Sequence, residues 1–135
     1  MKYTFYKYQG TGNDFVMFDN RKNEFPKDNV SLVASICNRR FGVGSDGLIL
    51  LEDDENTDFK MVYFNSDGKA GSMCGNGGRC IVAFAHFLGI IRDKTVFIAV
   101  DGLHEANIDG DVVSLKMSDV QEIKEKANAL YLNTG

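Results

Sequence analysis

The chain has 135 residues, of which 44% are hydrophobic and 25% are charged, a composition typical of one globular domain. Its net charge of −4 argues against nucleic acid and anionic membranes as partners. Apolar runs such as 48–51 and 96–100 are far shorter than the ~20 residues of a membrane-spanning helix. The N-terminus has no apolar signal-peptide core, and the three cysteines are an odd number, so we expect a cytoplasmic protein.

The first third of the sequence predicts two strands followed by a helix. An alternating, aromatic-rich segment at 2–8 and an apolar run at 15–18 predict strands joined by a glycine-containing turn at 10–14. Apolar side chains then recur with helical spacing, and the helix is expected to stop at Gly42. The helical face consists of Val30, Val33, Ile36 and Cys37, and the expected N-cap is Asp28 or Asn29.

A glycine-rich loop leads into a second helix in the middle of the chain. Two buried strands, 48–51 and 59–64, precede the loop, and the second ends in a turn at 65–68. The loop covers 71–80, and Gly89 closes the helix that follows it. Because this helix is apolar almost all round, we expect strands to surround it. Its apolar residues are Cys80, Phe84, Phe87 and Leu88 on one side and Ile81, Val82 and Ala85 on the others.

Three more strands, joined by Asp-Gly turns that are strong hairpin signals, complete the predicted fold. They cover 95–100, 103–108 and 112–117. We therefore expect an α+β domain with a curled, mainly antiparallel sheet wrapped around a central buried helix. This domain should occupy 1–117. The polar segment 118–135 should be a linker and, near 129–132, the first strand of a second domain that is absent.

Cys74 is the main candidate for chemistry because it precedes a helix and is followed by glycines. A helix N-terminus presents unbonded N–H groups and a partial positive charge, which stabilise a thiolate and lower the pKa of a cysteine. The N–H groups of 75–78 would also bind a carboxylate or phosphate, and glycine lets a ligand approach the backbone closely. The alternative interpretation of Cys74 is a small buried residue in a tight turn.

Several familiar site signatures fail on this chain. The segment 42–47 matches G-x-G-x-x-G, but it follows a predicted helix and precedes a strand, the reverse of a dinucleotide site. The loop 71–80 lacks the Lys-Ser/Thr ending of a nucleoside triphosphate site, and Arg79 follows Cys74 one residue too early for a phosphatase cradle. With two histidines and unsuitable cysteine spacing, no metal site is expected. Structural roles are expected for Cys37, Cys80, His86 and His104.

Four blocks of the sequence closely resemble diaminopimelate epimerase. They are 7–15, 42–48, 64–68 and 73–80, in the order of that family, and the end of the chain resembles the opening of its second domain. The resemblance implies a cofactor-independent isomerase that interconverts LL- and meso-diaminopimelate on the route to lysine and peptidoglycan precursors. It also implies two similar domains, each a curled sheet around a helix, with the substrate cleft between them.

The resemblance assigns roles to five residues. Cys74 would be one of two catalytic cysteines, Asn13 and Asn65 would hold the polar ends of the amino acid, and Gly75 and Asn76 would donate backbone N–H groups to its carboxylate. Asparagine suits a zwitterion because its amide offers a donor and an acceptor without net charge. Both Asn13 and Asn65 also lie in predicted turns, where asparagine is common for backbone reasons alone.

The implied chemistry needs two thiol groups on opposite faces of the α-carbon. One thiolate removes the α-proton, a thiol returns a proton to the other face, and donors at the helix N-terminus stabilise the carbanion in place of pyridoxal. The family's second cysteine belongs to the second domain, and neither Cys37 nor Cys80 replaces it, so we expect these 135 residues alone to be inactive.

The expected partners are therefore the amino-acid substrate and a second domain or chain that supplies the other thiol. Relatives also return their C-terminal end to the sheet of the first domain. This chain is thus expected to expose a strand edge that favours a homodimer.

Two other functions stay open on the sequence. The first is a cysteine-dependent racemase of the same fold that acts on another amino acid, such as proline or hydroxyproline, because the motifs specify the α-amino-acid head better than its side chain. Gly47 is a weaker point of comparison with the family, since some relatives carry a glutamine there that reaches the substrate region, whereas here only the backbone could contribute. The second is a non-catalytic binding or assembly module.

Overall fold

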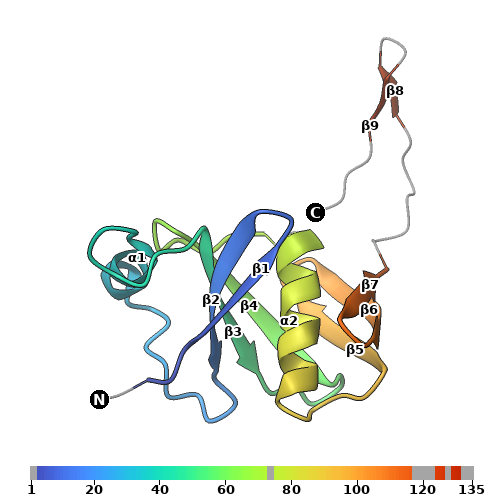
Figure 1. The fold of residues 1–135 in the computed structure, drawn as a ribbon, viewed down its shortest axis with the longest axis horizontal. Coiled ribbons are helices and arrows are strands. Elements are labelled where there is room, and N and C mark those ends of the chain that lie inside the picture. Colours follow the sequence, from blue (N-terminus) through green and yellow to red (C-terminus); the bar gives the residue numbers. More distant parts are fainter. Residues whose placement is uncertain (1–2, 73–74, 117–123, 127–128, 132–135) are drawn as a thin grey trace.

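The computed structural model describes residues 3–72, 75–116, 124–126 and 129–131. Within that part of the chain, seven strands form one curled sheet with helix α2 against its inner face (Figure 1), which confirms the predicted α+β architecture. The elements are β1 (Tyr6–Gly10), β2 (Asn13–Asp19), α1 (Val30–Cys37), β3 (Gly47–Glu52), β4 (Phe59–Asn65), α2 (Gly75–Phe87), β5 (Lys94–Ala99), β6 (Gly102–Asp109), β7 (Val112–Leu115), β8 (Lys124–Lys126) and β9 (Ala129–Tyr131).

The seven strands lie side by side in chain order. Four of the neighbouring pairs are antiparallel, while β2 with β3 and β4 with β5 are parallel. A parallel pair needs a crossover connection, and the two helices supply it: α1 links β2 to β3, and α2 links β4 to β5. The pairing of β4 with β5 is short, with only Phe59–Phe97 and Lys60–Ile98 in register.

Helix α2 is the centre of the main hydrophobic core. It contacts β1, β2, β3, β6 and β7, and its side chains pack with those that the strands direct inward. Phe84 is fully buried, with its ring centroid 5.0 Å from that of Tyr6 and 5.6 Å from that of Tyr8. The predicted central helix among strands is therefore confirmed.

The last turn of α2 is less enclosed than the sequence indicated. Phe87 is 62% exposed and His86 is also exposed, whereas we expected both inside a helix surrounded by protein. The reason is that β1 and β7 are the two edges of an open sheet, so none of the strands that the structure describes covers the face of α2 between them (Figure 1). The Tyr6 ring contacts the Phe87 ring edge to face, with 5.6 Å between the ring centroids.

Helix α1 covers the opposite face of the sheet with a second, smaller core. Asn29 is the N-cap, since its side-chain oxygen accepts a hydrogen bond from the backbone N–H of Leu32 at 3.0 Å. The helix ends at Cys37, five residues before the predicted stop at Gly42. Asn38 turns the chain there, because its side-chain oxygen accepts hydrogen bonds from the backbone N–H groups of Arg40 and Phe41. This second core comprises Val16, Phe18, Phe25, Val33, Cys37, Leu48, Leu50 and Phe64.

Near the C-terminus, β8 and β9 form a separate two-stranded antiparallel sheet. A strand was predicted near 129–132, but 124–126 was expected to be linker. The proposed domain boundary between residues 117 and 118 lies outside the described residues. No helix in the described part of the chain is long and apolar enough to cross a bilayer.

Candidate active site

Three neighbouring strands bring candidate residues to one edge of the sheet. β2 begins at Asn13, β3 begins at Gly47 and β4 ends at Asn65. In the sheet register Phe15 lies beside Gly47, and Gly47 lies beside Asn65. Since adjacent strands are about 5 Å apart, Asn13 and Asn65 lie on the same edge and two strands apart. The topology thus places both predicted asparagines on one rim.

The first turn of α2 reaches the same rim. This helix starts at Gly75, and a Cβ added to Gly10, which pairs with Asn13, would lie 3.5 Å from the carbonyl oxygen of Asn76. The close approach allows a direct bond, in which Nδ2 of Asn76 donates to Oδ1 of Asn13 at 2.6 Å. Arg79 in turn donates to Oδ1 of Asn76. Three of the predicted site residues are therefore brought together at the N-terminus of a buried helix.

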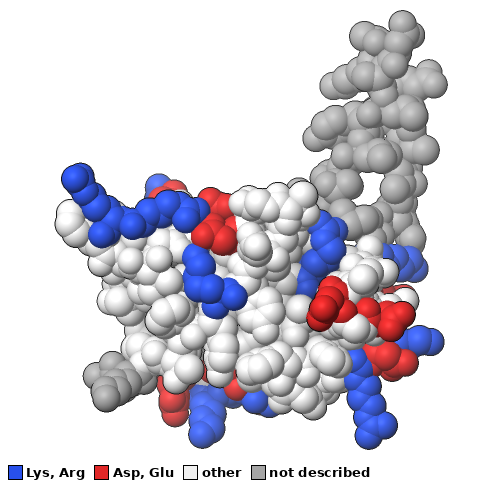
Figure 2. Space-filling view, in the orientation of Figure 1, with Lys and Arg blue, Asp and Glu red and all other residues white. Residues whose placement is uncertain are grey.

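An ionic cluster fixes the start of β2. Nδ2 of Asn13 donates to Oδ2 of Asp46 at 3.1 Å, and the Arg39 guanidinium donates to both Asp14, at 2.8 Å, and Asp46, at 3.0 Å. Lys7 pairs with Asp14 at 2.8 Å. Acidic and basic side chains meet along the upper edge of the molecule in Figure 2. The hydrogen bond from Arg39 holds the pKa of Asp14 well below its usual range, and the bond from Asn13 lowers the pKa of Asp46.

The lowered pKa of Asp14 predicts a specific dependence of stability on pH. A carboxyl whose pKa is lower in the folded than in the unfolded chain stabilises the fold above its ordinary pKa of about 4, and that contribution is lost as the pH falls further. At pH 7 the D14N variant should therefore unfold at a lower urea concentration than the unsubstituted chain. At pH 3 the two midpoints should lie closer together. An equal gap at both pH values would contradict this assignment.

Asn65 lies in a tight turn that its own backbone closes. Its N–H donates to the carbonyl of Lys69, and its carbonyl accepts from the N–H of Gly68, both at 2.9 Å. The side-chain oxygen of Asn65 lies 2.8 Å from the position that a Cβ on Gly71 would occupy, so the segment leading toward α2 passes directly over this amide. None of the hydrogen bonds described here joins Asn65 to Asn13 or Asn76. The structure places Asn65 on the same rim but in a separate group.

Gly47 has no room for a side chain in this packing. A Cβ there would lie 2.8 Å from the hydroxyl oxygen of Tyr63 and 2.9 Å from the carbonyl oxygen of Phe64. The Tyr63 ring therefore occupies the space that a longer residue at position 47 would need. The packing of β3 against β4 therefore accounts for glycine at this position.

The predicted catalytic residue, Cys74, lies outside the described residues. Cys37 and Cys80 are described, and both are buried. Burial raises the pKa of the Cys37 thiol, which disfavours its reactive thiolate. Packing roles for these two cysteines agree with the sequence prediction. His104 is also buried, 2.7 Å from Asp101 and stacked on Phe97, as expected of a structural histidine.

A cavity of about 400 Å³ opens where β4 and β5 diverge. Met61, Tyr63 and Ala99 line it, together with Lys27 and Lys60. Asn13, Asn65, Gly75 and Asn76 are not among the lining residues. The cavity nevertheless adjoins the rim, because Gly71 lines it and a Cβ on Gly71 would lie 2.8 Å from the side-chain oxygen of Asn65.

Sequence reasoning missed the residues that hold the two asparagines in place. Asp46 lies inside the block 42–48, one of the four that resemble the family, and only this position in the sequence pointed to a role for it. Arg39 gave no signal, because its partner Asp14 is 25 residues away and only the fold brings them together. Arg79 was considered only as part of a phosphate cradle, whereas its guanidinium bonds to the Asn76 side chain.

Comparisons with known proteins bear on the family of this chain. The family model described as diaminopimelate epimerase matches residues 5–122. A diaminopimelate epimerase of Flavobacterium psychrophilum is 62% identical over 131 residues, which are 96% of this chain and 51% of that protein. That of Aquifex aeolicus is 37% identical over 97% of this chain and 54% of that protein. The chain thus spans about half the length of these relatives.

Solved structures with little sequence identity share the fold. A hydroxyproline epimerase from Agrobacterium vitis superposes with a TM-score of 0.63 at 15% identity, over 84% of this chain and 40% of that one. A methylitaconate-delta-isomerase gives 0.61 at 13% identity, over 97% of this chain and 70% of that one. These likenesses support the curled-sheet architecture alone. By its family match and its close relatives, the chain belongs to the diaminopimelate epimerase family.

Proposed function

We propose that this chain supplies one half of the active site of a cytoplasmic diaminopimelate epimerase. The observation that carries the proposal is the bond of 2.6 Å between Asn13 and Asn76 at the N-terminus of α2. It shows that two distant blocks of the family resemblance converge on one rim. The 62% identity to a relative over almost the whole chain supports the same activity.

The proposed reaction moves one proton off the α-carbon and one onto it. The Cys74 thiolate takes the α-proton, so that an S–H bond forms, the C–H bond breaks and the electron pair stays on carbon. A thiol on the opposite face then gives its proton to that carbon and becomes a thiolate, which inverts the centre. No electrons are exchanged, and the reverse direction uses the two sulfurs in swapped roles.

The N-terminus of α2 is suited to stabilise this chemistry. Gly75 is the first residue of the helix and directly follows Cys74 in sequence. In this proposal the N–H groups of the first turn and the helix dipole stabilise the Cys74 thiolate. The same donors would bind the substrate carboxylate and stabilise the carbanion. In this proposal Asn13 and Asn65 bind polar ends of the amino acid from the sheet rim.

The second thiol must come from outside the described part of this chain. Cys37 and Cys80 are buried in the two cores and are unsuited to approach a substrate from the opposite face. We therefore propose that the remaining half of the site is supplied by a second domain or a second chain. The 135 residues alone should then turn over substrate very slowly.

The proposal is tested by deuterium exchange. The chain, extended to the length of its relatives, is incubated with LL-diaminopimelate in D2O, and deuterium at the α-carbon is measured by mass spectrometry. We expect one deuterium per inverted centre with diaminopimelate, little with proline or hydroxyproline, and little from the 135-residue chain alone.

Exchange with proline or hydroxyproline in place of diaminopimelate would favour the other racemase. Exchange with none of the amino acids would leave a binding or assembly module. Rapid turnover by the 135 residues alone would contradict the requirement for a second thiol.

A further inference from the structure

The side-chain amide of Asn13 has a defined orientation. Its NH2 group donates to Asp46, and its oxygen accepts from Asn76 at 2.6 Å. The two ends of an amide are nearly equal in size, so only hydrogen-bond partners decide which end points where. A carboxylate can only accept and a guanidinium can only donate. Asp46 at one end and Arg79 at the other therefore give the row of two amides a single polarity.

Asp46 is itself held in a fixed position. Its backbone N–H donates to the carbonyl and to the carboxylate of Asp14, both at 3.0 Å. Its Oδ2 accepts from the backbone N–H of Asp14 at 3.2 Å, and its Oδ1 accepts from Arg39 at 3.0 Å. The Asp46 carboxylate is thus fixed beside Asn13 by its bonds to Asp14 on β2 and to Arg39 in the loop after α1.

The polarity decides what the amides offer to a ligand. Each NH2 group has two N–H bonds, and within the described part of the chain the row uses one from Asn13 and one from Asn76. Contacts within that part of the chain leave a second N–H of each amide unused, and in this inference these N–H groups bind an anion. If the Asn13 amide were reversed, its oxygen would lie where its NH2 group now lies, and a carboxylate near it would be repelled.

We propose that Asp46, held by Arg39, is a positioning residue for substrate binding. It selects the orientation of Asn13 that presents an N–H to a carboxylate of the amino acid. This inference rests on the proposed function, because it takes the rim of Asn13 and Asn76 as the place where the amino acid binds.

The test is the D46N variant of the chain extended to the length of its relatives, assayed by α-deuterium exchange. The new amide can donate as well as accept, so it no longer fixes the polarity of Asn13. We expect KM for diaminopimelate to rise about tenfold or more while kcat changes by less than about threefold, since hydrogen bonds near charged groups contribute binding at that level.

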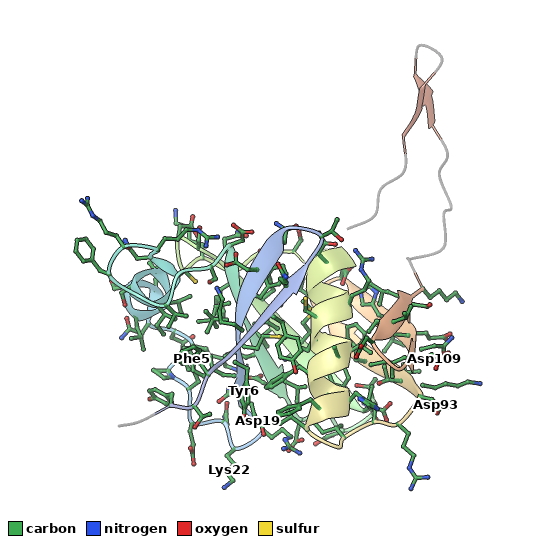
Figure 3. The ribbon with its side chains drawn as sticks, in the orientation of Figure 1. Phe5, Tyr6, Asp19, Lys22, Asp93 and Asp109 are labelled. Carbon is green, nitrogen blue, oxygen red and sulfur yellow. The ribbon has the colours of Figure 1, made fainter. Side chains whose placement is uncertain are left out.

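A matched control is D19N. Asp19 is the last residue of β2, the strand that begins at Asn13, and pairs with Arg21 at 2.7 Å. Figure 3 shows Asp19 at the end of β2 away from the rim. This variant also removes the charge of an Asp–Arg pair but leaves Asn13 untouched. Its KM and kcat should match those of the unsubstituted protein.

A second variant separates positioning from folding. In N13D/D46N the new amide donates to the new carboxylate, so the row stays bonded, but a negative charge now faces the substrate. We expect an unfolding midpoint closer to that of the unsubstituted protein than the D46N midpoint, together with a KM above that of D46N.

Equal KM values for D46N and D19N, with normal exchange by the unsubstituted protein, would overturn this inference alone. A substrate affinity of N13D/D46N close to that of the unsubstituted protein would overturn it as well. Absence of exchange by the unsubstituted protein would overturn the proposed function and the inference together.

Discussion

Replacement of Cys74 by serine, in the chain extended to the length of its relatives, is expected to lower α-deuterium exchange by about a thousandfold or more. A general base that removes a proton in the transition state contributes about 100- to 10,000-fold. Serine keeps the size of the side chain but has a hydroxyl that does not ionise near neutral pH, so the donors at the start of α2 have no thiolate to stabilise. The measurement is the initial rate of deuterium uptake at saturating diaminopimelate.

The matched control for this variant is Cys37→Ala. Cys37, the last residue of α1, is 3% exposed and packs in the second core, and burial raises the pKa of its thiol. Its loss should lower stability slightly and leave the exchange rate within about twofold, because the thiol is buried in the second core and cannot contact a substrate. If the C74S protein exchanged as fast as the C37A protein, Cys74 would not be the base and the proposed mechanism would be wrong.

Phe84→Ala should cost a large part of the stability of the domain. The Phe84 side chain is fully buried in the middle of α2, between the rings of Tyr6 and Tyr8. Truncation of a buried phenylalanine costs about 3–5 kcal/mol, and a domain is stable by only about 5–15 kcal/mol. We therefore expect the free energy of unfolding, measured by urea titration followed by far-UV circular dichroism, to fall by that amount.

Phe41→Ala provides the comparison for Phe84. Phe41 is 86% exposed and its ring lies 5.9 Å from the guanidinium carbon of Arg40. The same change of residue type at this surface position should cost less than about 1 kcal/mol. Similar losses in the two variants would show that α2 is not the centre on which the sheet packs.

Most of the fold could be predicted from local patterns in the sequence. The apolar stretch after the glycine-rich loop predicts a central helix, and Asp-Gly turns predict the hairpins of β5, β6 and β7, as the structure confirms. The exposure of Phe87 could not be predicted, because it depends on the gap between the two edge strands rather than on the helix itself. The position of the chain turn at Asn38 depends on side-chain bonds to the backbone that the spacing of apolar residues does not reveal.

The candidate site was predictable only in part. Asn13 and Asn76 were named through a family resemblance, and the structure then placed them in contact. Their partners were missed because each contact is long-range: Asp46 lies 33 residues from Asn13 and meets it only through the parallel register of β2 and β3. Sequence patterns indicate which residues are neighbours within one helix or strand. The hydrogen bonds that hold Asn13 depend instead on which strands are adjacent in the sheet.

The short parallel pairing of β4 with β5 has a mechanical consequence. Only two register pairs join β1–β4 to β5–β7, so the backbone ladder binds these two groups of strands weakly. Helix α2 packs against strands of both groups, and this packing is therefore the main interaction that holds the two groups together. A small tilt of this helix would change the spacing of the two groups, and it would carry the amides of the rim with it.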